Sequence, residues 1–316
     1  MTKARKLIEE YHTKVDVFLE LLDARLPLSS RNPLLTQLIG QKPRIILLNK
    51  TDLVDKASLT AWKDYFAQTE GTTCVMVSAK DRRNLPQAIQ EAVGQCRSAK
   101  WFGTRRARGM IVGIPNVGKS SLINAFSGGK KASTAPQAGH TKGVQRIRIS
   151  DHFELIDTPG ILWHKFEDRE TGIRLAILGA ISDRILDHLT LACLALGMMN
   201  ASQRGLLNKR FKIQPQLWAS LEGEVLQLPS LQSPLSEENN EEIPSLQVWD
   251  NGMTPGRILL LEEIGRKRGF LQKGGIVDVD KAALILIQEF REGLLGPVCL
   301  DAIPLKNTIP PLEKGV

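Results

Sequence analysis

Short apolar runs, each followed at once by a polar loop, recur through the first half of the chain. This pattern is typical of buried strands in a parallel sheet, whose carboxyl ends carry functional loops. The predicted strands cover residues 15–22, 44–50, 73–80, 110–115 and 153–160, with a half-buried, alternating strand at 144–149.

The segments between these runs have the spacing of helices. Helices are expected over 2–12, 58–68 and 85–96, and another should begin at Lys119. Strands alternating with helices predict an α/β fold, with a mostly parallel sheet and helices on both faces. Ligands of such sheets bind at the carboxyl ends of the strands, which is where the polar motifs of this chain stand.

The second half of the 316-residue chain has a different pattern. Residues 171–210 and 257–292 have helical spacing, and the stretch 213–256 is rich in Pro, Ser and Glu, which is typical of a flexible insertion. We therefore expect three parts: an α/β domain over 1–165, a small all-helical domain formed by 166–212 and 257–300, and the insertion between its halves.

A phosphate-binding loop is predicted at GIPNVGKS, Gly113 to Ser120. It matches G-x-x-x-x-G-K-S between a strand and a helix, where backbone N–H groups can approach phosphate oxygens. Lys119 should neutralise the β- and γ-phosphates, and the Ser120 hydroxyl should bind Mg²⁺. The expected nucleotide contacts of this loop are Pro115, Asn116, Val117, Gly118, Lys119, Ser120 and Ser121.

Two later motifs complete the predicted phosphate and Mg²⁺ site. In DTPG, Asp157 should hold Mg²⁺ through water and the Gly160 N–H can meet the γ-phosphate. In GHTKG, Thr141 is the candidate for sensing the γ-phosphate and Mg²⁺, with Thr134 as the alternative. Lys119, Thr141 and Gly160 are therefore the expected catalytic groups.

The tetrapeptide NKTD predicts that the base is guanine. The Asp52 carboxylate can accept hydrogen bonds from guanine N1–H and N2–H, which adenine does not offer, and the Lys50 stem can cover the ring. Asn49 should support the loop. After the next strand, Ser78, Ala79 and Lys80 form a second base loop, with the Ala79 N–H directed at guanine O6. A lone NKTD is often a surface turn, but its position after a buried strand favours base recognition.

The order of these motifs is unusual. NKTD precedes the phosphate loop, whereas Ras-like GTPases have the phosphate loop first. The complete set in the reversed order predicts a circularly permuted Ras-like P-loop GTPase domain.

Charge suggests the kind of partner. The net charge is +8, and basic residues concentrate in 97–108 and 266–273, which favours a polyanion bound through its phosphates. The alternative is simply a basic soluble protein. No apolar run is long enough for a membrane span, and four scattered cysteines indicate reduced thiols in a cytoplasmic protein.

The motifs resemble those of circularly permuted GTPases, most closely the ribosome biogenesis GTPase A (YlqF/RbgA-like) family. The matching segments are TKARKL, DARLP, NKTDL, SAK, GIPNVGKSSLINA, GHTKG, DTPGILWHKFED and the C-terminal GFLQKGGIVDVDKAALILIQEFREGLLG. The resemblance implies a GTPase that binds GTP or GDP with Mg²⁺ and acts late in assembly of the large ribosomal subunit. It also implies that the helical domain binds precursor particles through rRNA rather than DNA. We expect a monomer.

Ile161 and Leu162 follow Gly160, where Ras-like enzymes have a glutamine that orients water. Hydrolysis should therefore be slow alone and activated by ribosomal particles. The resemblance also suggests that Asn116 seats a K⁺ ion against the phosphates; the alternative is that it only shapes the loop. Two other functions remain open: a GTP-dependent RNA-binding scaffold with negligible turnover, and a permuted GTPase that serves the small subunit.

Overall fold

The computed structural model describes residues 3–128, 145–157, 169–181, 187–221 and 253–304. Thr134, Thr141 and Gly160 lie outside these ranges, so the predictions for them stay predictions.

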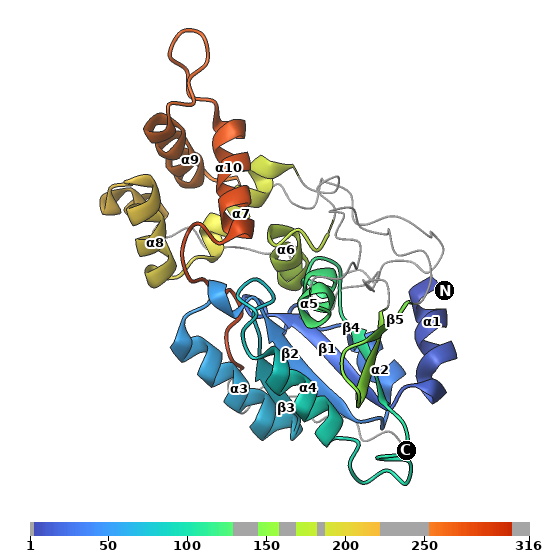
Figure 1. The fold of residues 1–316 in the computed structure, drawn as a ribbon. Helices are drawn as coiled ribbons and strands as arrows, with labels where there is room; N and C mark the ends of the chain where they lie inside the picture. The colour runs from blue at the N-terminus through green and yellow to red at the C-terminus, as the bar shows by residue number, and fades with distance from the viewer. Residues whose placement is uncertain (1–2, 129–144, 158–168, 182–186, 222–252, 305–316) are drawn as a thin grey trace.

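A six-stranded sheet forms the centre of the first half of the chain, in the order β3-β2-β1-β4-β6-β5 (Figure 1). Neighbouring strands are parallel except β5 and β6, which are antiparallel. The strands are β1 Val17–Asp23, β2 Arg44–Asn49, β3 Thr73–Met76, β4 Ala107–Val112, β5 Gln145–Arg148 and β6 Phe153–Asp157. The carboxyl ends of the parallel strands meet at one edge, as predicted.

Helices cover both faces of this sheet, because successive side chains of a strand point to opposite faces. Phe18 and Leu22 of β1 pack toward the first group, and Leu19 and Leu21 pack toward the second. The first group is α1 Lys3–Tyr11, α2 Pro33–Ile39 and α3 Lys56–Glu70. The second group is α4 Leu85–Gly94 and α5 Lys119–Phe126. The predicted fold class is confirmed.

One helix, α2, was not expected from the pattern. It is short, and its start depends on local chemistry rather than on apolar periodicity. The Asn32 side chain accepts a hydrogen bond from the Leu34 N–H, and Pro33 stands at the first helical position, where its missing N–H costs nothing.

A carboxylate lies buried within the apolar strand β1. Glu20 is completely buried and forms ion pairs with Arg31, at 3.1 Å, and Arg44, at 3.2 Å. Glu70, at the end of α3, pairs with the same two guanidinium groups. Together the four charges satisfy one another, which is the condition for placing charges inside a fold.

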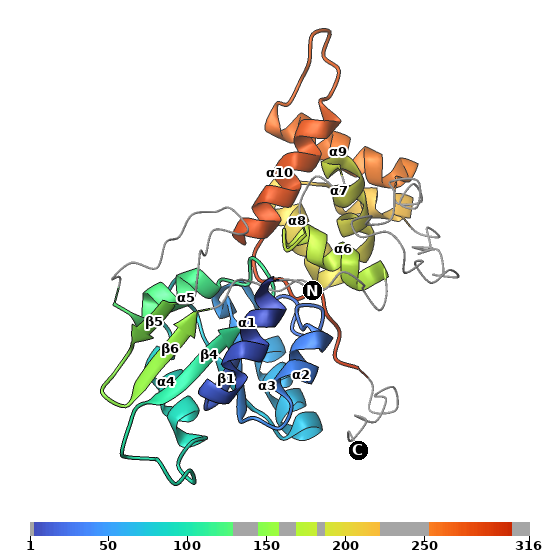
Figure 2. The same cartoon turned by 90° about the vertical axis from the view of Figure 1, so that its right-hand side faces the viewer.

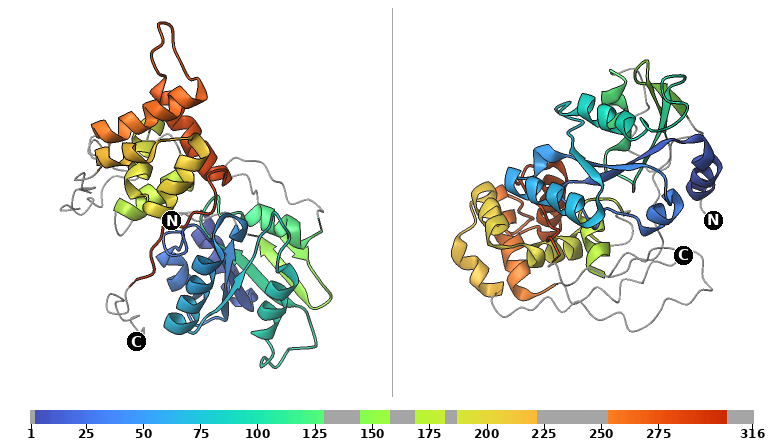
Figure 3. Two further views of the ribbon diagram at one scale, coloured as in Figure 1. Left: turned by 90° about the vertical axis from the view of Figure 1, so that its left-hand side faces the viewer. Right: turned by 90° about the horizontal axis from the view of Figure 1, so that it is seen from below.

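The second half of the chain folds as helices beyond the carboxyl ends of the strands (Figure 2). They are α6 Arg169–Ile177, α7 His188–Met198, α8 Ala201–Phe211, the 3₁₀ helix Pro215–Leu221, α9 Pro255–Arg268 and α10 Val279–Glu292. The loop between α9 and α10 extends away from the rest of the molecule (Figure 3). None of the described helices is long and apolar enough to cross a membrane.

The structure describes both ends of the stretch 213–256, which was predicted to be a flexible insertion. Ile213, Trp218 and Leu221 are buried in the helical core, and α9 already begins at Pro255. The described ends of this stretch therefore belong to the packed helical part, contrary to the expectation of flexibility there. The predicted domain boundaries otherwise stay predictions.

After α10 the chain returns to the α/β part. The Val298 N–H donates to the Leu53 carbonyl at 2.9 Å, directly after the NKTD motif. The buried Asp301 carboxylate accepts hydrogen bonds from the Ser29 N–H and hydroxyl at 2.8 and 2.6 Å. The helical part is thus attached at the strand-end edge, beside the predicted base loop.

The four cysteines are free thiols, and three of them are buried. Burial raises the pKa of both Cys74 and Cys299 to about 12. These thiols therefore remain protonated and poorly nucleophilic at neutral pH.

Candidate nucleotide site

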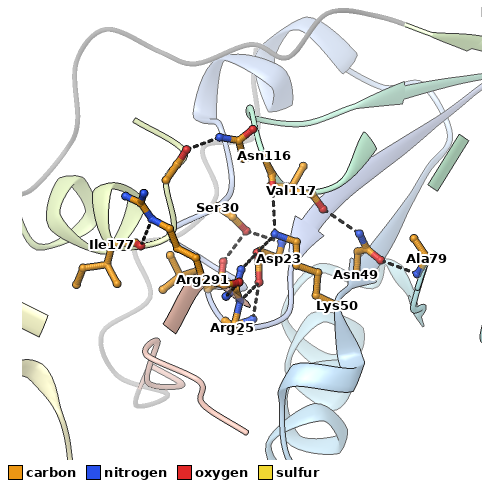
Figure 4. Close-up of polar contacts among 12 residues, drawn as sticks. Asp23, Arg25, Ser30, Asn49, Lys50, Ala79, Asn116, Val117, Ile177 and Arg291 are labelled. Atoms are coloured by element: carbon orange, nitrogen blue, oxygen red, sulfur yellow. Dashed lines mark hydrogen bonds and ion pairs between the residues drawn. The ribbon is translucent and has the colours of Figure 1, made fainter. Parts of the chain in front are cut away.

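Asn49 joins the base loop to the phosphate loop. It is the last residue of β2, and its side-chain Nδ2 donates to the Val117 carbonyl at 2.9 Å (Figure 4). Its Oδ1 accepts a hydrogen bond from the Ala79 N–H at 3.2 Å. One buried amide therefore holds three predicted nucleotide-binding segments together, although they come from distant parts of the sequence.

Lys50 adds a second link between the same two loops. It adopts a left-handed backbone conformation with φ of 62°, and its Nζ donates to the Asn116 carbonyl at 2.8 Å. Its ammonium also lies 2.9 Å from the Asp23 carboxylate. Burial lowers the pKa of Lys50, and the Asp23 charge opposes this shift.

Asp52 is oriented by the second base loop. Its Oδ1 accepts a hydrogen bond from the Ser78 hydroxyl at 2.8 Å, and that hydroxyl in turn accepts one from the Asp81 N–H. Ser78 is completely buried, so its hydroxyl acts by fixing Asp52. Lys80, in contrast, is exposed at the rim.

The phosphate loop has the backbone that its sequence requires. Gly118 has φ of 96° and stands directly before α5, and Asn116 has φ of 61°. A Cβ atom at Gly118 would lie 2.5 Å from Asn49 Nδ2, so the contact between the two loops depends on this glycine. The Lys119 ammonium donates to the Gly113 and Ile114 carbonyls, at 3.0 and 2.8 Å, and lies inside the loop.

The residues predicted to bind Mg²⁺ are only partly described. Ser120 is a half-buried residue in the first turn of α5, and Asp157 ends β6 in register with Ile111 of β4. Both oxygens are of the kind that Mg²⁺ prefers, so the residue types fit this ion. Thr141 and Gly160 lie outside the described ranges. Pro115 is half-buried, and Ser121 is exposed on the first turn of the helix.

Asn116 contacts the helical part directly. Its side-chain amide donates to the Gly179 carbonyl, just after α6 (Figure 4). The prediction assigned Asn116 to K⁺ and included no such contact. The nitrogen of this amide faces Gly179, and its oxygen is the atom that a cation would require.

Two charged residues at the site were given no role by the sequence. Asp23 ends β1 in register with Asn49, and Arg25 follows it in the next loop. Both are buried. Burial alone would raise the pKa of Asp23, but the charges of Arg25 and Lys50 outweigh it and hold this pKa well below its usual range. The one available signal was their position in DARLP, directly after a buried strand.

The sheet order, the phosphate loop before α5 and the adjoining NKTD loop define a P-loop GTPase. The description "50S ribosome-binding GTPase" belongs to the family model that matches residues 108–210. The ribosome biogenesis GTPase A of Priestia megaterium is 35% identical over 308 residues, covering 95% of this chain and 94% of that protein. The chain therefore belongs to the ribosome biogenesis GTPase A family.

Two further comparisons agree. The ribosome biogenesis GTPase A of Bacillus cereus is also 35% identical, covering 95% of this chain and 91% of its own length. The crystal structure of GNP-bound YlqF from T. maritima has a TM-score of 0.56 at 22% identity, over 95% of this chain and 98% of that one. The second likeness supports the fold alone.

Proposed function

We propose that this GTPase binds GTP and Mg²⁺ at the site described and, in the GTP state, binds the precursor of the large ribosomal subunit through its rRNA. The observation that carries the nucleotide assignment is the direct bonding of the base loop to the phosphate loop. Asn49 reaches the Val117 carbonyl, and Lys50 reaches the Asn116 carbonyl. A base held at Asp52 and phosphates held at Lys119 would thus belong to one nucleotide.

The domain is, in this proposal, a circularly permuted Ras-like one. β4, which leads into the phosphate loop, lies between β1 and β6 although it follows β1–β3 in sequence. The NKTD strand β2 comes earlier in the chain but is separated from β4 only by β1. The site therefore depends on the spatial order of the strands and not on their order along the chain.

Each proposed site residue has a distinct role in hydrolysis. Lys119 holds the β- and γ-phosphates, and Ser120 and Asp157 hold Mg²⁺, which supplies positive charge against the transferring group when bound. Thr141 and Gly160 would contact the γ-phosphate, and the Asn116 oxygen would take part in binding K⁺. Because Ile161 cannot orient water, turnover should be slow until a ribosomal particle orders the site.

The helical part supplies the proposed RNA-binding surface. In the other basic stretch, Arg105 and Arg108 are already paired with Asp16 and Glu154. The α9–α10 loop instead presents Lys273, which is exposed, with Leu271 and Ile276 also exposed beside it. A projecting loop that carries an exposed lysine can reach phosphates within a folded RNA. The description of the family model as 50S-binding supports the large subunit as partner.

Co-sedimentation with purified ribosomal subunits tests the proposed partner. Binding to large subunits or their precursors in the presence of a non-hydrolysable GTP analogue, with weaker binding in GDP, supports it. Preference for small subunits would indicate the alternative partner. Equal binding in both nucleotide states would contradict the proposal. Lys273→Glu should weaken binding and lower its salt dependence, whereas Lys63→Glu on α3, which is also an exposed lysine, should not.

Turnover assays test the proposed enzymology. Rates should rise with large subunits and should be higher in K⁺ than in Na⁺. Negligible turnover under all of these conditions would favour the scaffold alternative. A cytoplasmic monomer, as expected for such a factor, is checked by fractionation and by light scattering of the purified protein.

A further inference from the structure

The Asp23 carboxylate is shared by two cations of different origin. Its Oδ1 accepts from Arg25 Nε at 3.0 Å, and its Oδ2 accepts from Arg25 Nη2 at 2.9 Å (Figure 4). The same Oδ2 lies 2.9 Å from Lys50 Nζ. The position of the Lys50 ammonium, and so of the stem that would cover the guanine ring, is therefore set partly by Asp23.

The third nitrogen of the same guanidinium group, Nη1, contacts the helical part. Arg25 Nη1 donates to the Phe290 and Arg291 carbonyls, both at 3.1 Å. These carbonyls belong to the last turn of α10, and the Phe290 carbonyl also accepts a hydrogen bond from the Gly293 N–H at 3.1 Å. A positive charge there also suits the negative end of the helix dipole. Arg25 therefore contacts Asp23, the partner of Lys50, and the end of α10 at the same time. Its exposed fraction is only 2%.

The contacts continue from α10 back to the phosphate loop. The Arg291 side chain donates to the Ala176 carbonyl at 2.9 Å and the Ile177 carbonyl at 3.0 Å, at the end of α6. Gly179 follows with φ of 71°, and a Cβ atom there would lie 3.2 Å from the Arg291 guanidinium. The Gly179 carbonyl accepts from Asn116, whose own carbonyl accepts from Lys50. Together with the backbone between Ile177 and Gly179, these polar contacts form a closed ring from Lys50 through Arg25 and Arg291 back to Lys50.

We propose that Asp23 and Arg25 are positioning residues that couple the guanine-binding base loop to helix α10. Nucleotide bound against Lys50 would hold Asp23 and Arg25 in place and thereby stabilise the end of α10. Movement of α10 would, in turn, release Arg25 and loosen Lys50. This inference rests on the proposed binding of guanine nucleotide at this site.

The geometry of the guanidinium makes the coupling specific. Arginine has donors in a rigid planar fork, so one side chain can satisfy Asp23 and the α10 carbonyls only while both stay in register. Lysine carries the same charge, but its donors radiate from a single atom and do not span Asp23 and the α10 carbonyls as the fork does. Arg25→Lys should therefore preserve the charge balance around Asp23 and break the connection to α10.

Hydrogen exchange of the full-length protein, with and without GDP, tests the proposal. In the wild type, saturating GDP should slow exchange of the amides at the end of α10, residues 289–293, by about tenfold. Arg25→Lys should lose this slowing and bind GDP about fivefold more weakly, as expected for one lost hydrogen bond. Arg25→Gln, which keeps planar donors without the charge, should lose it as well and serves if the lysine variant does not fold.

Arg174→Lys is the matched control. Arg174 is a partly buried arginine at the same junction, and it pairs with Glu170 and with Asp301, the latter at 3.4 Å, rather than with Asp23 or Lys50. This variant should keep the GDP-dependent slowing. Slowing that persists in the Arg25 variants, or that is lost equally in Arg174→Lys, overturns the proposal. Absence of GDP binding to the wild type in calorimetry would instead contradict the proposed function itself.

Discussion

At the scale of single residues, the site is held together by buried polar groups that each have two partners. Asn49 bonds both Val117 and Ala79, and the Ser78 hydroxyl joins Asp52 to the Asp81 N–H. Such groups cost free energy when left unsatisfied, so the loops that supply their partners are fixed in relation to one another. This explains how short motifs from distant segments are held side by side at one place in the fold.

Asp52→Asn should change the choice of base. The carboxylate can accept both N1–H and N2–H of guanine, whereas an amide offers one acceptor and one donor. Affinity for GDP should fall by roughly 10- to 100-fold, equivalent to one charged hydrogen bond, and the xanthine nucleotide, which has a carbonyl at C2, should bind better than GDP. Calorimetric titrations with GDP and with the xanthine nucleotide measure the two affinities. A variant that still prefers guanine would contradict the role of Asp52.

Asp23→Asn should destabilise the protein in a pH-dependent way. The Asp23 pKa is depressed in the folded state, so its carboxylate contributes stability above the unfolded value, near pH 4, and loses it as the pH falls below that value. Removing this partner from the buried Arg25 and the half-buried Lys50 should cost about 3–5 kcal/mol at pH 7. Denaturant titrations of both proteins should show the difference shrinking at pH 3. A constant difference would contradict the charge assignment.

The sequence predicted the motif residues because each depends on local chemistry after a strand. It could not predict Arg25, whose partners Phe290 and Arg291 are about 265 residues away in the chain. It also could not predict that Glu20, within the apolar run of β1, meets Arg31 and Arg44. These contacts exist only once distant elements pack together, and no spacing rule describes them.

At the scale of elements, the sheet fixes the site and the ends of helices connect it to the second part. The carboxyl ends of β1, β2 and β4 carry Asp23, Asn49 and the phosphate loop to one edge. The end of α10 approaches the same edge, with Gly293 packed against Leu53 of the NKTDL segment. Apolar periodicity predicted these strands and helices, but which helix end meets which loop depends on tertiary packing.

Gly293→Ala should be more harmful than Gly269→Ala. Both glycines follow a helix with a left-handed backbone, φ of 77° and 71°, so both substitutions should cost about 1 kcal/mol. A Cβ atom at Gly293 would also lie 2.3 Å from Leu53 Cδ2, while one at Gly269 meets nothing within 4 Å. An additional loss of about 1–3 kcal/mol is expected for Gly293→Ala in denaturant titration. Equal losses would show that α10 does not pack closely here.

At the scale of the whole molecule, the helical part is attached to the side of the α/β domain where the nucleotide would bind. The attachment includes the Arg25 and Asn116 contacts and the returning tail at Val298 and Asp301. In the proposed mechanism, these polar contacts at the domain junction are the route by which a change of nucleotide would reach the proposed RNA-binding surface. The sequence predicted an α/β domain, a helical domain and an insertion, but not this arrangement, because the junction contacts form only when distant elements pack together.

The central claim is that Asp52 and Lys119 serve a single guanine nucleotide although their motifs occur in reversed order. Calorimetric titration of the full-length protein with matched guanosine and adenosine triphosphate analogues, in Mg²⁺, tests it most directly. We predict one site that favours the guanosine ligand by at least about 100-fold, since adenine leaves the Asp52 carboxylate without its donors. Equal affinity for the two ligands would contradict the claim.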